Sequence, residues 1–146
     1  MAYRAKMAAF LLLFTATGMA IADVAAAGFR DEAPIRVVQI TMSKDAYHQY
    51  VHEIHKFADS YAFAIRVSHS SPKPDDILVQ LWRSDVKIIG ANTSEVGARS
   101  ITFDIALFNN CGCDVPVPPT TINQLVFGLK QTVGQIRGAI VSEKQS

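Results

Sequence analysis

The chain has 146 residues, 49% of them hydrophobic, and its 14 lysines and arginines nearly balance its 13 aspartates and glutamates, which gives a formal net charge of +1. The basic residues are scattered along the sequence, whereas nucleic-acid-binding proteins concentrate Lys and Arg on one surface. The composition therefore predicts a globular protein of one domain and argues against a nucleic-acid partner.

The first 27 residues have the layout of a secretory signal peptide. Arg4 and Lys6 precede a short apolar stretch, and small residues follow at the spacing that a signal peptidase reads. The alternative is an uncleaved membrane anchor, but a spanning helix needs roughly 20 continuous apolar residues, about twice what is present. We expect cleavage after Ala22 or Ala27. Residues 28–146 would then form a single periplasmic or secreted domain with no membrane span.

The rest of the chain alternates between strand-like and helix-like patterns. Runs of β-branched and aromatic residues predict strands over residues 35–42, 63–68, 77–83, 86–91 and 101–108. Apolar residues that recur every three to four positions predict helices over residues 44–61 and from Thr120 or Thr121 to about Gly138. The short connections between strands favour antiparallel pairing. We therefore expect an α+β two-layer sandwich of order β-α-β-β-β-β-α, with two helices packed on one face of the sheet.

One face of this sheet would be free of helices, and alternation along the strands predicts which side chains it carries. They include the only tryptophan, and we take four of them as candidate binding residues: Arg66, Gln80, Trp82 and Asp104. Trp and Arg are the residue types that most often anchor a binding partner. The alternative is an ordinary solvated face with one aromatic ring lying across it.

The first predicted helix carries a stripe of polar, metal-ligating residue types. His48, His52, His55 and Asp59 fall within one sector of the helix, beside the apolar stripe and turned toward solvent. Imidazoles four residues apart can chelate Zn²⁺ or Cu²⁺. The alternatives are a plain polar flank and a pH-dependent contact. The segment from His52 to His55 is one residue short of the zinc-protease HExxH motif, so we predict no protease.

Cys111 and Cys113 are the only cysteines. In an exported protein two thiols usually oxidise, and a bridge between residues so close in sequence would be strained and easily reduced. Three hypotheses stay open for this pair: a disulfide that staples the loop, redox or metal chemistry, and free thiols or bonding between chains.

The sequence contains no nucleophile motif and no glycine-rich phosphate loop. We therefore expect a small exported binding or interaction protein without enzymatic activity, with a protein partner in the cell envelope and no cofactor. The alternative is a periplasmic thiol-redox or metal-binding protein that uses Cys111 and Cys113 or the histidine stripe. A hydrolytic enzyme is the third hypothesis.

Overall fold

The computed structural model describes residues 32–69, 76–95, 97–110 and 115–144. The chain divides into two units, and all described residues belong to the second, Glu32–Ser146. The predicted signal peptide lies outside the described residues, as do Cys111 and Cys113, so both hypotheses stay predictions. Within the described ranges, no helix combines the length and the apolar composition needed to cross a membrane.

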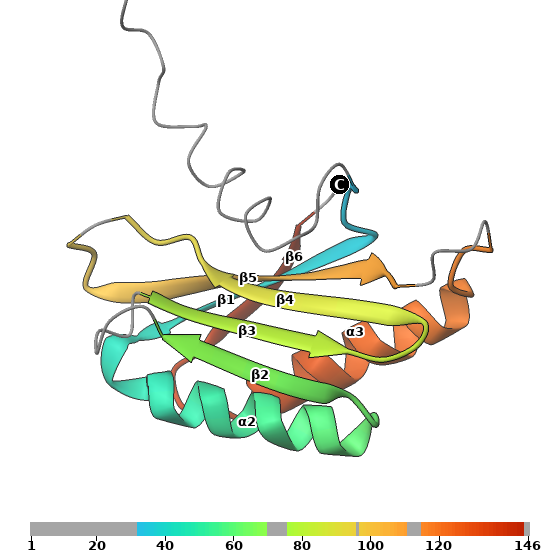
Figure 1. Cartoon of the computed structure of the whole chain (residues 1–146). Helices are drawn as coiled ribbons and strands as arrows, with labels where there is room; N and C mark the ends of the chain where they lie inside the picture. Colours follow the sequence, from blue (N-terminus) through green and yellow to red (C-terminus); the bar gives the residue numbers. More distant parts are fainter. Residues whose placement is uncertain (1–31, 70–75, 96, 111–114, 145–146) are drawn as a thin grey trace, which may run out of the picture. The chain divides into compact units, whose positions relative to one another are not determined.

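The described part of the chain forms one antiparallel sheet of six strands, with two α-helices and a short 3₁₀ helix. In chain order the elements are β1 (Arg36–Ser43), η1 (Lys44–Ala46), α2 (Tyr47–Ser60), β2 (Ala64–His69), β3 (Ile77–Trp82), β4 (Val86–Asn92), β5 (Ser100–Asn109), α3 (Pro119–Val133) and β6 (Ile140–Lys144). The strands lie side by side in the order β2-β3-β4-β5-β1-β6. Figure 1 shows α2 and α3 on the same side of the sheet, which confirms the α+β sandwich.

The core lies between the sheet and the two helices. Every second residue of the central strands β1 and β5 is buried there, because successive side chains of a strand point to opposite faces. The apolar stripes of the helices meet these strands, and the ring of Tyr50 from α2 stacks on Phe103 of β5 at 4.3 Å between centroids. Fully burying an apolar side chain of this size contributes about 1.5–3 kcal/mol.

The end of the chain differs from the prediction. α3 stops at Val133 instead of continuing to about Gly138, and the chain turns at Gly138, whose φ of 74° suits a residue without a side chain. The following residues form β6, which pairs with β1 from Ile140 opposite Thr41 to Lys144 opposite Val37. This strand was not predicted. It extends the sheet beyond β1 and makes β6 one of its two edges.

Both helices begin at other residues than predicted: the segment from Lys44 starts with the short helix η1, so that α2 itself begins at Tyr47. Ser43 precedes the short helix η1 and makes no side-chain capping bond, and α3 begins at Pro119, before Thr120 and Thr121. Proline suits the first turn of a helix because its φ is already close to the helical value and its missing N–H is not needed there.

Candidate functional site

Three of the four predicted binding residues lie together at one side of the sheet. In the pairing of β2 with β3, Arg66 is directly opposite Gln80, and Ala64 is directly opposite Trp82. Side chains that are opposite each other in an antiparallel pair point to the same face. These four residues therefore form a patch on the face that points away from α2 and α3. We call that face the helix-free face and the four residues the Trp82 patch.

The Trp82 patch is accessible. The Trp82 side chain is 45% exposed, Arg66 is exposed, and Gln80 is half-buried. Ala64 is small, so the indole ring beside it remains reachable from the β2 side of the sheet. Among the described residues, Arg66 has neither an ion pair nor a hydrogen-bond partner. The patch thus combines a partly exposed aromatic ring with an arginine whose charge is not neutralised by its described neighbours.

The structure does not bring Asp104 into this patch. Asp104 lies on β5, and β4 separates it from β3. Gln39 of β1 donates a hydrogen bond from Nε2 to Asp104 Oδ1 at 2.8 Å, and Lys144 of β6 forms an ion pair with Oδ2. Asp104 therefore lies on the same helix-free face as Arg66, but its carboxylate is bonded to Gln39 and Lys144 and does not pair with Arg66. Sequence reasoning missed Lys144 as its partner because β6 itself was not predicted.

The middle of the helix-free face is buried. Ile89 of β4 and Phe108 of β5 are each only 2% exposed, although their side chains point away from the helices. Ile89 lies opposite Gln80 of β3, and Phe108 lies opposite Lys87 of β4. The accessible part of this face is accordingly narrower than the sequence predicts, and it includes the Trp82 patch.

Arg83, unlike Arg66, uses its guanidinium group in several hydrogen bonds within the described fold. Arg83 follows Trp82 directly and donates two hydrogen bonds to Asp85, from Nε to Oδ1 at 2.6 Å and from Nη2 to Oδ2 at 2.9 Å. Its Nη1 donates to the carbonyl of Tyr61 at 2.9 Å. These hydrogen bonds hold the pKa of Asp85 below its ordinary value. The hydrogen bonds of Arg83 therefore link the β3–β4 turn to the residue after α2, whereas Arg66 makes no such structural contact with the described residues.

A polar hollow of about 410 Å³ lies at another part of the sheet. Gln39, Thr102 and Lys144 contribute to it from the helix-free face, and Thr93 and Ser94 contribute from the loop after β4. Ser94 is already bonded, since Asn92 Oδ1 accepts a hydrogen bond from its backbone N–H at 2.8 Å. Lys144 is held by Asp104. The lining is thus polar, and several of its groups satisfy one another.

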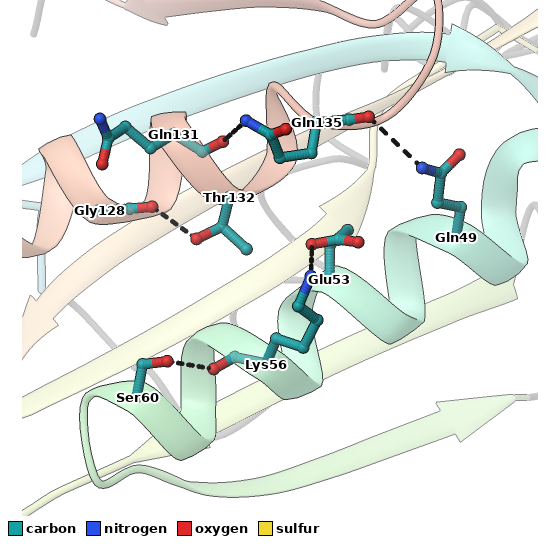
Figure 2. Close-up of polar contacts among 8 residues, drawn as sticks. All are labelled: Gln49, Glu53, Lys56, Ser60, Gly128, Gln131, Thr132 and Gln135. Carbon is teal, nitrogen blue, oxygen red and sulfur yellow. Dashed lines mark hydrogen bonds and ion pairs between the residues drawn. The ribbon is translucent and has the colours of Figure 1, made fainter.

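A second hollow, of about 320 Å³, follows the seam between α2 and α3. Glu53, only 6% exposed, lies at this seam and forms an ion pair with Lys56 Nζ at 3.0 Å. Figure 2 shows that the hydroxyls of Ser60 and Thr132 donate back to carbonyls of their own helices, at 2.8 and 2.7 Å. One bond drawn there crosses the seam, from Gln49 Nε2 in α2 to the backbone carbonyl of Gln135, just beyond the end of α3, at 3.4 Å. These polar groups serve the packing of the helices and do not converge on one point.

The histidine stripe lies where helical geometry predicts it. His48, His52, His55 and Asp59 are all exposed on α2. Within the part of the chain that the structure describes, no group of three or more His, Cys, Asp or Glu side chains is arranged to hold a metal ion. Metal binding at this stripe stays a prediction, and the positions of these side chains give it no further support.

Comparison of the chain with protein-family models, with curated proteins and with solved structures gives no match. The functional interpretation therefore rests on the sequence and on the geometry of the described residues.

Proposed function

We propose that this protein is a small exported binding protein without enzymatic activity, and that it contacts a partner in the cell envelope through the Trp82 patch. The observation that carries the proposal is the pairing of a 45% exposed Trp82 with Arg66, which has no described partner, on the helix-free face of a regular sheet.

The composition of the patch favours recognition of another molecule. Tryptophan and arginine are enriched among the residues that dominate binding energies, because tryptophan offers a large rigid ring and arginine a planar guanidinium with several hydrogen-bond donors. Here both side chains project from adjacent strands in continuous register. A regular strand already has an ordered backbone, so no loop has to become ordered on binding, which lowers the cost of association.

Three carboxylates elsewhere in the described fold are held in ion pairs, which favours a binding function over a catalytic one. Glu53 is paired with Lys56, Asp85 with Arg83, and Asp104 with Lys144. Each carboxylate is thus held as a structural ion pair at a separate place. General acid–base catalysis instead needs a proton donor and acceptor that converge on a substrate.

The proposal is tested by capture of partners from a cell-envelope extract with the purified protein and two matched variants. Trp82→Ala removes the aromatic ring of the patch, and Phe127→Ala removes another aromatic ring, 63% exposed, from α3. We expect Phe127→Ala to retain the captured partner and Trp82→Ala to lose it. Retention of the partner by Trp82→Ala would overturn the proposal.

Arg66→Ala is a second variant of the Trp82 patch, which still tests the proposal if Trp82→Ala does not fold. Arg66 is exposed and has no described partner, so we expect Arg66→Ala to leave the fold intact. Circular dichroism and urea unfolding establish that each variant is folded before capture is scored. If folded Arg66→Ala and folded Trp82→Ala both bind like the unaltered protein, the Trp82 patch is not the binding surface.

A further inference from the structure

The strand beside the Trp82 patch is an edge of the sheet with an unbroken backbone. β2 pairs with β3 over six consecutive residues, from Ala64 opposite Trp82 to His69 opposite Ile77. On its other side, no described backbone group hydrogen-bonds to Ala64–His69. In an edge strand every second residue directs its N–H and C=O away from the sheet. β2 therefore presents a row of backbone donors and acceptors.

The two edges of this sheet differ in how they are protected. In natural proteins, charged side chains, prolines or bulges on an edge strand prevent it from pairing with another chain. β6 ends in Glu143 and Lys144, both held in ion pairs, with Arg36 and Lys130 around Glu143 and Asp104 beside Lys144. β2 has no proline, no lysine and no bulge, and Arg66 is its only arginine. The β2 edge is thus the one available for pairing.

The side chains around β2 define what an added strand would meet. On the helix-free side it would meet the Arg66 guanidinium, which has no described partner, beside Ala64 and the Trp82 ring. On the other side it would meet Ile65 and Val67, which pack against the core but remain partly exposed. Figure 1 shows α2 running along that side of β2, and Val51 of α2 is likewise only partly buried.

We propose that the partner of this protein presents an extended segment of alternating acidic and apolar residues, which adds to β2 as a further antiparallel or parallel strand. The segment's backbone bonds to β2, its acidic side chains face Arg66, and its apolar side chains cover Ile65 and Val67. Strand addition of this kind takes affinity from main-chain hydrogen bonds and specificity from alternate side chains. This inference rests on the proposed binding function of the Trp82 patch and names the class of partner.

Charge explains why the occupant is a different chain and not a second copy. If two copies paired antiparallel through β2 with a common helix-free face, residues facing the same side would oppose one another. The two Arg66 side chains would then lie opposite or diagonal to each other. Like charges in these positions destabilise a strand pair, whereas an acidic residue there neutralises Arg66.

The test uses a synthetic peptide of alternating valine and glutamate residues, as long as β2 and with blocked termini. Backbone hydrogen exchange of the purified protein is measured with and without the peptide. We expect slower exchange in Ala64–His69 and no change in Ile140–Lys144. Arg66→Gln should weaken binding about fivefold, as for the loss of one partly solvated ion pair. Arg137→Gln is the matched control, because Arg137 is an exposed arginine outside β2.

Two altered peptides complete the experiment. A peptide methylated at every backbone nitrogen cannot donate hydrogen bonds along either edge and should not protect β2. A peptide of valine and lysine should bind at least fivefold more weakly than the glutamate peptide. Protection that is equal for all three peptides, or absent for all, would overturn strand addition.

Further outcomes separate this inference from the proposed function. If a captured partner depends on Trp82 but leaves exchange in Ala64–His69 unchanged, the binding function stands and strand addition is wrong. If β2 becomes protected on raising the protein concentration without peptide, a second copy is the occupant and the inference is overturned. If the glutamate peptide protects β2 while Trp82→Ala and Arg66→Ala still capture the envelope partner, the edge binds peptides but the proposed function fails.

Discussion

The hydroxyl of Tyr50 occupies the space that a side chain at Gly90 would need. A Cβ atom at Gly90 would lie 2.5 Å from Tyr50 Oη, closer than real Cβ contacts come. The Tyr50 ring cannot move aside easily, because it is completely buried and stacked on Phe103. The hydroxyl has no hydrogen-bond partner among the described residues. One glycine in β4 therefore permits one tyrosine in α2 to pack against the sheet.

The first prediction concerns this pair. Gly90→Ala should destabilise the protein by about 1–3 kcal/mol, the usual cost of overpacking a core. Tyr50→Phe should be neutral or stabilising, because it removes a buried hydroxyl whose desolvation is not offset by a hydrogen bond. In the Tyr50→Phe background, Gly90→Ala should cost clearly less. Urea unfolding of the two single variants and the double variant measures this coupling, and strictly additive free energies would contradict it.

The same tyrosine predicts a loss of stability in alkali. Burial raises the pKa of Tyr50 above its ordinary value, because the phenolate would be completely desolvated. In the unfolded chain the phenol ionises near its ordinary pKa of about 10, so above that pH the unfolded state binds fewer protons than the folded state. The free energy of unfolding should therefore fall as the pH rises past about 10. Tyr50→Phe should flatten this fall, and an unchanged pH dependence would exclude Tyr50 as its source.

A second glycine accommodates a second tyrosine, where α2 ends against α3. A Cβ at Gly128 would coincide with the hydroxyl end of the Tyr61 ring. Alanine is a better helix former than glycine by about 1 kcal/mol, but we expect the clash to dominate. Gly128→Ala should lower the free energy of unfolding, whereas Gln131→Ala, at an exposed position of the same helix, should change it little. A stabilised Gly128→Ala variant would contradict this prediction and would show that the Tyr61 ring moves aside at little cost.

The fourth prediction concerns acid. Hydrogen bonds from Arg83 lower the pKa of Asp85, so below the ordinary aspartate pKa of about 3.9 the unfolded state takes up a proton before the folded state does. The pair's contribution is present above that pH and is lost as the pH falls further. Asp85→Asn should remove this part of the acid dependence and cost less than about 1 kcal/mol at neutral pH, because both side chains are partly exposed.

Asp59→Asn is the control for the acid experiment, because Asp59 is exposed on α2. Urea unfolding at neutral pH and near pH 3 compares the two variants with the unaltered protein. An acid dependence that is the same in Asp85→Asn as in the unaltered protein would contradict the assignment to the Arg83 pair.

Local patterns were sufficient to predict most of the fold. Alternation in β1, β3 and β5 and the apolar stripes of α2 and α3 predicted their burial, because each pattern has the period of its element. The final strand β6 escaped prediction because Ile140 and Val141 are its only apolar residues, and its pairing with β1 joins segments about a hundred positions apart. The end of α3 was placed too late because Ile136, just beyond it, continues the apolar spacing and is also buried.

The candidate site was predictable only in part, for the same reason. Arg66, Gln80 and Trp82 could be assigned to one face because β2 and β3 are close in sequence and strongly patterned. The partners of Asp104 could not be predicted, since Gln39 and Lys144 reach it from strands distant in sequence. The burial of Ile89 and Phe108 on the helix-free face was not predicted, although each follows a buried apolar residue, Ile88 or Leu107, and such a pair breaks the alternation as in strands buried on both faces.

The central claim, that the Trp82 patch is the surface on which a partner sits, is tested most directly by photo-crosslinking in cells. A photoreactive phenylalanine derivative replaces Ala64, which is exposed directly opposite Trp82, in one variant and Phe127, on α3, in the other. We predict a discrete crosslinked product from position 64, where the Trp82 ring is retained, and none from position 127. A product from position 127 alone, or no product from position 64 in a folded variant, would contradict the claim.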